Sequence, residues 1–223
     1  MEIKKQTISA NGVEIPAILM NPRSEVSAIV MHGYGGNKEE ILGLSGYLAF
    51  MDIETVTIDL RGHGESAAEY SCKMLDDLNA LIKHLNKQTV ITIGHSLGGR
   101  LALLADAAYK VGISPALGQT YSEQTQTAIK NFRSYRVKET SPETNFQILA
   151  KLPMASITRE NSFILYGSRD VPEIQRDCLE LEQQGMNVAR INQALHHDIY
   201  TLPETLAAIG KFIRDIRETN KEK

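Results

Sequence analysis

The sequence predicts an α/β fold with one mostly parallel sheet that begins with an antiparallel hairpin. Short apolar runs typical of buried strands alternate along the chain with amphipathic segments of helical spacing. The first two strand-like segments are joined by Asn11-Gly12, a dipeptide that favours a tight hairpin turn. Because parallel strands need crossover connections, the alternation predicts helices on both faces of the sheet.

The predicted elements follow one another in a regular order. The hairpin comprises residues 3–9 and 13–20 and ends at Asn21-Pro22. Six further strands are expected at residues 28–31, 53–58, 90–93, 111–114, 163–166 and 187–191, and the first of them is a continuous apolar run, which suits burial on both faces. Helices with apolar residues three or four positions apart are expected at residues 38–50, 74–85, 97–109 and 174–184 and from Pro203 onwards. The sheet is therefore expected to be eight-stranded.

One polar, Thr/Gln-rich stretch from residue 116 to about residue 157 interrupts the alternation. We interpret it as an insertion after the sixth strand, containing short helices. Typical element and loop lengths account for about 185 residues, and the remainder of about 40 matches this insertion. The sequence thus predicts a single domain over residues 1–223 with a short cap at about residues 116–157.

Composition argues against several classes of protein. The 24 Lys and Arg residues are balanced by 27 Asp and Glu residues, so a nucleic-acid partner is not expected. No apolar stretch approaches the about 20 residues of a membrane-spanning helix, and the N-terminus lacks the apolar run of a secretory signal. Cys72 and Cys178 have neither disulfide-framework nor metal-site spacing. We therefore expect a cytoplasmic protein without a metal.

The segment Gly94-His95-Ser96-Leu97-Gly98-Gly99 follows a predicted buried strand and begins a predicted helix. A G-x-S-x-G sequence in this context predicts a sharp turn that exposes the serine hydroxyl, because side chains at the two outer glycines would crowd the turn. The alternative is a phosphate-binding turn in which Ser96 only caps the helix. The P-loop lysine and the G-x-G-x-x-G pattern that would favour this alternative are missing.

Three further segments extend the pattern: His32-Gly33-Tyr34-Gly35-Gly36 after the third strand, Asp59 to Ser66 (DLRGHGES) after the fourth, and Gly167-Ser168-Arg169-Asp170 after the seventh. With these segments the chain resembles the α/β-hydrolase family over almost its whole length. The DLRGHGES loop is similar to that of the esterase and monoacylglycerol-lipase-like branches. The resemblance implies an α/β-hydrolase fold and a serine hydrolase.

A serine nucleophile needs an imidazole to take its proton and a carboxylate to orient that imidazole. On this fold the three groups occur in the order Ser, acid, His, and Ser96, Asp170 and His197 satisfy it, each directly after a predicted strand. His196 is the competing base. The resemblance favours His197, because the family's histidine is often followed by a short acidic or aromatic residue and then an apolar one, as in His197-Asp198-Ile199.

Each other candidate has an alternative role. Asp170 could instead cap the following helix. Asp177 and Asp198 are the alternative candidates for the acid that orients the histidine. The oxyanion hole should consist of the backbone N–H groups of Leu97 and Tyr34. The resemblance assigns Asp59 and Arg61 to the organisation of neighbouring loops rather than to catalysis.

The insertion carries four bases within nine residues, Lys130, Arg133, Arg136 and Lys138. Two interpretations remain open. The bases could form an entrance that favours an anionic group such as an acid, a phosphate or a coenzyme A tail. Alternatively they form an exposed helix face balanced by the glutamates at positions 123, 139 and 143.

These residues predict an esterase-type serine hydrolase (EC 3.1) that cleaves a small-molecule acyl substrate through an acyl-enzyme. No cofactor is implied. Thioester cleavage or acyl transfer could use the same three groups, because the triad does not select the leaving group. A prediction of another class is a non-catalytic, ligand-binding or signalling homologue that uses the pocket as a receptor.

Overall fold

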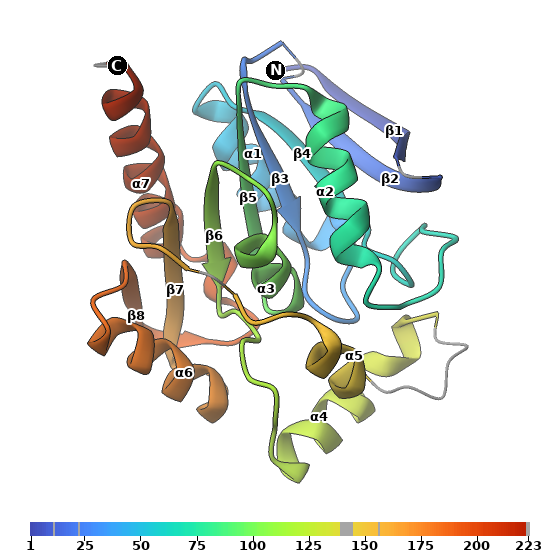
Figure 1. The fold of residues 1–223 in the computed structure, drawn as a ribbon, viewed down its shortest axis with the longest axis vertical. Coiled ribbons are helices and arrows are strands. Elements are labelled where there is room, and N and C mark those ends of the chain that lie inside the picture. Colours follow the sequence, from blue (N-terminus) through green and yellow to red (C-terminus); the bar gives the residue numbers. More distant parts are fainter. Residues whose placement is uncertain (11, 22, 139–144, 156, 222–223) are drawn as a thin grey trace.

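One mixed sheet forms the centre of the computed structural model, which describes residues 1–223 except 11, 22, 139–144, 156 and 222–223 (Figure 1). Its eight strands lie in the order β1-β2-β4-β3-β5-β6-β7-β8. Their bounds are β1 Ile3–Ala10, β2 Val13–Met20, β3 Val26–Met31, β4 Glu54–Ile58, β5 Thr89–His95, β6 Tyr109–Ile113, β7 Ser162–Arg169 and β8 Val188–Leu195.

The pairing of the strands confirms the predicted hairpin and parallel sheet. β1 pairs with β2 and β2 with β4 in antiparallel fashion, whereas every later pairing, from β3 with β4 to β7 with β8, is parallel. The carboxyl ends of β3 to β8 therefore meet at one edge, the lower edge in Figure 1. In open α/β sheets, ligands bind outside this edge.

Helices cover both faces of the sheet, as predicted. The helices α1 (Leu42–Phe50) and α7 (Pro203–Lys221) pack on one face, and α2 (Met74–Leu85), α3 (Leu97–Leu104) and α6 (Pro172–Gln183) pack on the other. Strand β3 shows why its sequence is continuously apolar. Ile29 and Met31 lie in the core under α2 and α3, whereas the alternate residues Ala28 and Val30 lie in the core under α1 and α7.

Several element bounds differ from the predictions, and three of these differences change an element by more than its terminal residues. The predicted helix 38–50 is divided into a 3₁₀ turn, η1 (Lys38–Ile41), capped by the Asn37 side chain, and α1. The predicted helix 97–109 ends at Leu104, because residues from Tyr109 onwards pair with β5 as part of β6. The last strand, predicted to end at residue 191, continues to Leu195. This third difference makes His196 the first residue after the strand.

The insertion after β6 lies beyond the carboxyl edge of the sheet (Figure 1). It contains α4 (Glu123–Arg133), the turn η2 (Ser134–Arg136) and α5 (Asn145–Lys151), while residues 139–144 and 156 of the predicted range 116–157 lie outside the described residues. Hydrogen bonds on both sides of α4 attach the insertion to elements outside it. The Ser122 N–H donates to Glu173 of α6 at 2.8 Å, and Arg136 donates to Glu40 of η1 at 2.6 Å.

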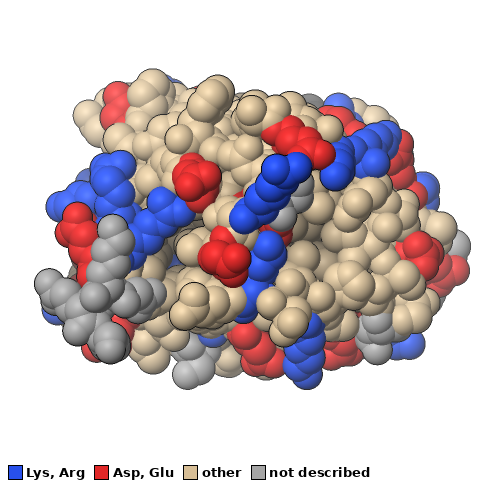
Figure 2. Space-filling model, turned by 90° about the horizontal axis from the view of Figure 1, so that it is seen from above, with Lys and Arg blue, Asp and Glu red and all other residues tan. Residues whose placement is uncertain are grey.

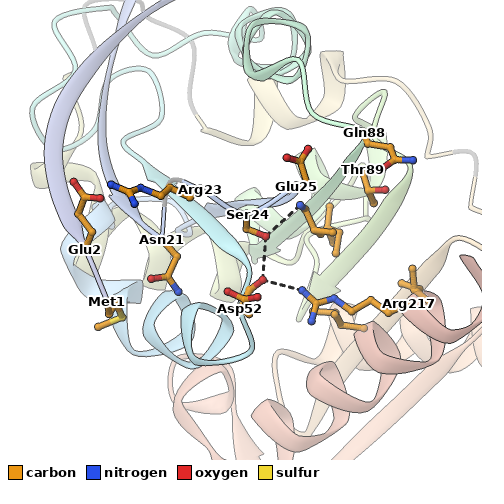
Figure 3. A pocket seen from close by; sticks show the side chains of 14 residues that line it. Met1, Glu2, Asn21, Arg23, Ser24, Glu25, Asp52, Gln88, Thr89 and Arg217 are labelled. Atoms are coloured by element: carbon orange, nitrogen blue, oxygen red, sulfur yellow. Dashed lines mark hydrogen bonds between the residues drawn. The ribbon is translucent and has the colours of Figure 1, made fainter. Parts of the chain in front are cut away.

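The opposite edge of the sheet, seen in Figure 2, carries basic and acidic side chains that alternate without a patch of one sign. A cavity of about 1280 Å³ opens there between the strand ends and α7 (Figure 3). Arg217 crosses its wall and donates hydrogen bonds to the carbonyls of Met51 at 2.8 Å and Asp52 at 2.9 Å. Across the described part of the chain, every helix is too short or too polar to span a bilayer.

Candidate active site

The turn between β5 and α3 holds Ser96 in a strained backbone conformation. Ser96 has φ 54° and ψ −112°, a region that residues with a side chain seldom adopt. The turn is tight because a Cβ at Gly94 would lie 2.1 Å from the Gly98 carbonyl oxygen, and one at Gly98 would lie 2.5 Å from the His32 carbonyl oxygen. The two glycines therefore permit the predicted sharp turn, and Ser96 remains half-exposed at its tip.

Three side chains from three strand ends form a continuous hydrogen-bonded row. Nε2 of His196, after β8, lies 3.1 Å from the Ser96 hydroxyl oxygen. Nδ1 of the same ring lies 2.7 Å from a carboxylate oxygen of Asp170, after β7. With the proton on Nδ1, the ring donates to Asp170 and accepts from the Ser96 hydroxyl, which is the arrangement that makes a serine nucleophilic.

The prediction that His197 would meet Ser96 and Asp170 is wrong in position, because the structure places His196 there and His197 exposed at the rim of the same cavity. The reason is the end of β8. A register shift opposite Gly167 lets β8 continue to Leu195, so that His196 is the first residue beyond the strand. The Asp198 carboxylate then accepts the Leu195 N–H at 2.8 Å and closes the turn. Asp198 therefore shapes the loop instead of serving as the acid.

The Asp170 carboxylate is buried and held in its charged form. It accepts hydrogen bonds from the Ser114 hydroxyl, from the Val171 N–H at 2.7 Å and from His196. Burial alone would raise the pKa of Asp170, but the hydrogen bonds and the charge interaction with His196 outweigh it and lower that pKa. The capping residue of α6 is Val171 rather than Asp170, and Asp177 pairs with Arg176 at 2.7 Å. Of these acids only Asp170 contacts His196.

Two supporting residues were not predicted as part of the site. Nε2–H of His95 donates to the backbone carbonyl of His196 at 2.6 Å, and the two rings lie 4.8 Å apart. Burial lowers the pKa of His95 to about 3, so this imidazole remains neutral and can keep a fixed donor. Ser114, at the end of β6, holds the far oxygen of Asp170. A polar residue directly after a buried strand was the available signal for Ser114.

The loop after β3 lies against the nucleophile turn. A Cβ at Gly33 would lie 3.2 Å from Cβ of Ser96, so the loop approaches as closely as its glycine permits. Tyr34 follows directly, and its side chain lines the cavity around Ser96. Leu97 is the first residue of α3, where backbone N–H groups have no partner within the helix. The two residues predicted to supply the oxyanion hole thus lie on segments that meet at Ser96.

The loop after β4 is held by a buried ion cluster. Nζ of Lys38 is fully buried and lies 2.7 Å from Asp59 and 2.9 Å from Glu65. Burial lowers the pKa of Lys38, but its hydrogen bonds to these carboxylates outweigh burial and raise it above the usual range. Asp59 also accepts the Lys38 N–H at 2.8 Å, which ties the loop to η1. These contacts fit the expected organising role of Asp59, and Arg61 pairs with Asp77 of α2.

The cavity at Ser96 has a volume of about 180 Å³ and is closed on one side by the insertion. Its apolar wall consists of Ile41, Ala128, Ile129 and Val171. Of the four bases noted in the insertion, Arg133 alone lines this cavity, while Lys130 faces a neighbouring cavity of about 350 Å³. In the described residues, no group of three or more His, Cys, Asp or Glu side chains is placed to hold a metal ion.

Comparison with known proteins agrees with this architecture. Residues 29–113 match the family model described as the alpha/beta hydrolase fold. The chain is 28% identical over 156 residues to the sn-1-specific diacylglycerol lipase ABHD11 of Mus musculus, a match that covers 64% of this chain and 50% of that protein. The chain spans half or less of the length of the curated relatives that it matches.

Solved structures show the same fold over nearly the whole chain. A serine hydrolase without a lid from Xanthomonas campestris superimposes with a TM-score of 0.69 at 18% identity, covering 96% of this chain and 95% of that one. A thioesterase domain from the curacin biosynthetic pathway gives a TM-score of 0.68 at 16% identity, covering 96% and 99%. Sheet order, the match over residues 29–113 and structural similarity together show that the chain has the α/β-hydrolase fold.

Proposed function

We propose that this protein is a serine hydrolase that cleaves a carboxylic ester or a related acyl bond. The observation that carries the proposal is the row Ser96–His196–Asp170, with hydrogen-bond distances of 3.1 and 2.7 Å and a strained, accessible serine. A receptor that only bound a ligand would not need this row. Its completeness favours an enzyme over the non-catalytic alternative.

The geometry supports an acyl-enzyme reaction in two halves. In the first, the Ser96 oxygen attacks the acyl carbon while Nε2 of His196 takes the hydroxyl proton, and Asp170 stabilises the imidazolium that forms. His196 then gives this proton to the leaving oxygen as the bond to the acyl carbon breaks. In the second, His196 takes a proton from water, the resulting oxygen attacks the acyl-enzyme, and Ser96 regains its proton as the acid leaves.

The backbone N–H groups of Tyr34 and Leu97 are our candidates for binding the oxyanion in both halves. Such a donor stabilises charge that exists only in the transition state, and losing one typically costs roughly 10²-fold or more in turnover. The small cavity points to short or open-ended acyl substrates. All of these steps use side chains, backbone groups and water.

Buried Cys178 and exposed Cys72 are both free thiols, which supports our expectation of a reducing, cytoplasmic setting.

A thioester is the second candidate substrate, because the thioesterase domain noted above has the same fold and the triad does not choose the leaving group. Ester and thioester substrates of matched chain length would distinguish the two. The proposal predicts the higher kcat/KM for the oxygen esters.

Replacing Ser96 by Ala is expected to reduce hydrolysis of short-chain p-nitrophenyl esters by roughly 10⁴-fold or more, because the attacking oxygen is removed while the fold remains. Turnover is measured at a pH near 7.5 with the wild-type chain and the variant at equal concentration. Matching urea midpoints would show that the variant is folded. Equal turnover in the two proteins would contradict the proposed function.

A further inference from the structure

The last residue of α4, Arg133, projects from the insertion into the cavity that contains Ser96. It lines this cavity together with Ile129, one turn earlier, and with the two histidines 196 and 197. Its backbone is fixed against the loop after β3, since a Cβ at Gly35 would lie 2.7 Å from the Arg133 Cβ and 2.8 Å from its carbonyl oxygen. Arg133 is therefore held by the same loop that we assign to the oxyanion hole.

Arg133 is paired more weakly with Glu40 than Arg136 is. Nη1 of Arg136 donates to one oxygen of Glu40 at 2.6 Å, whereas Nη1 of Arg133 lies 3.8 Å from the other oxygen, beyond hydrogen-bond distance. Two guanidinium groups thus share one carboxylate. Because the three groups carry two positive charges and one negative charge, their net charge is positive. Lys138 is occupied elsewhere, donating to the carbonyls of Gly64 and Ser66.

Among the described residues that line the cavity, Arg133 and Glu40 are the two with a permanent charge. Burial lowers the pKa of His32 to about 4, as it lowers that of His95 to about 3, so both rings are neutral near pH 7. The Arg133 side chain lines the cavity and is 35% exposed. Among the described residues, Glu40 at 3.8 Å is the acidic partner of the Arg133 guanidinium, beyond hydrogen-bond distance. A guanidinium is well suited to bind a carboxylate or phosphate with two hydrogen bonds.

We propose that Arg133 forms an anion subsite beside Ser96, so that the substrates are acyl compounds carrying a carboxylate or phosphate close to the scissile bond. This inference rests on the proposed hydrolase function and names its substrate class. Of the four bases in the insertion, Arg133 alone is then a candidate for binding the anion. Arg136 and Lys138 hold the insertion in place, and Lys130 faces the neighbouring cavity.

The test compares charged and neutral substrates of nearly equal shape. One pair places the charge on the acyl side, 4-nitrophenyl hemisuccinate against 4-nitrophenyl butyrate. The other places it on the leaving group, 4-acetoxybenzoate against its methyl ester. Arg133→Gln is expected to lower kcat/KM for the anionic member of at least one pair by about 10- to 100-fold, mainly through KM, because a charged hydrogen bond is lost. The neutral members should change by less than about threefold.

Lys130→Gln is the matched control, since it removes one charge from the same helix at a residue that faces the neighbouring cavity. It should leave the ratio of anionic to neutral kcat/KM unchanged. An equal loss for charged and neutral substrates in Arg133→Gln, or a loss of the same size in Lys130→Gln, would overturn the anion subsite. Ser96-dependent turnover of the neutral esters would remain in that case, so the hydrolase function would stand.

Binding without turnover separates the two proposals further. Calorimetry on the Ser96→Ala protein with 4-acetoxybenzoate and its methyl ester should show tighter binding of the anion, and the additional Arg133→Gln change should remove the difference. Equal affinity for both compounds would contradict the subsite. The expected preference for the anion, combined with no Ser96-dependent turnover in the unaltered chain, would instead contradict the hydrolase function alone.

Discussion

Replacing His196 by Ala is expected to lower kcat/KM for short-chain esters by roughly 10⁴-fold or more, whereas His197→Ala should stay within about threefold of the unaltered chain. The two residues are neighbours in sequence, but only the His196 ring contacts both Ser96 and Asp170, at 3.1 and 2.7 Å. Without that ring the serine keeps its proton, and Asp170 has no imidazolium to stabilise. Initial rates with p-nitrophenyl acetate across a range of concentrations measure both variants.

The His197→Ala protein is the matched control for this comparison, because it removes an imidazole from the rim of the same cavity. Urea unfolding should give similar midpoints for both variants, since His196 is only partly buried, with 24% of its side chain exposed. A large loss in His197→Ala together with a small loss in His196→Ala would show that the base is His197. The loop after β8 would then have to adopt another conformation during turnover.

The free energy of unfolding is expected to fall by about 4–6 kcal/mol between pH 7 and pH 5, owing to three buried neutral histidines. Burial lowers the pKa of His32 to about 4 and those of His63 and His95 to about 3. In the unfolded chain each ring recovers a pKa of about 6.5. Below that pH these rings are protonated in the unfolded state but remain neutral in the native state. The free energy of unfolding therefore decreases as the pH falls.

The sign and range of this effect follow from the same values. The contribution of the three rings is fully present above about pH 6.5 and is lost progressively as the pH falls towards the folded-state pKa values of about 4 and 3. Urea denaturation at half-unit intervals from pH 7.5 to pH 4.5 measures it. A change below about 1 kcal/mol between pH 7 and pH 5 would mean that these histidines are protonated in the folded protein.

The sequence allowed the fold to be predicted because strand and helix patterns in this chain are strong and local. The continuous apolar run of β3 requires burial on both faces of the sheet, and its residues lie in the cores on both faces. The glycines of the Gly94–Gly99 turn require a close approach of the backbone, which the structure shows at Gly94 and Gly98. The helix after the nucleophile could not be bounded correctly. Its apolar spacing continues past Leu104, and the pairing of Tyr109 with Ile91, a tertiary contact, ends it.

The same limit explains the error at the histidine pair. Which of two adjacent imidazoles faces Asp170 depends on a register shift between β7 and β8 and on Gln193, which has φ 59°. Neither feature has a signature in the residues around position 196, and a resemblance to the family's His-Asp-apolar pattern favoured the wrong neighbour. The contacts of His95 and Ser114 were also hidden, because each joins residues far apart in the chain.

Covalent labelling of the nucleophile tests the Ser96–His196–Asp170 row most directly. A fluorophosphonate probe at pH 7.5 should modify Ser96, located by mass spectrometry of the digested protein. The labelling rate should fall by at least about 10²-fold in His196→Ala and remain within about threefold in His197→Ala. Labelling at another residue, or labelling of Ser96 at the same rate with and without the His196 ring, would contradict the proposed active site.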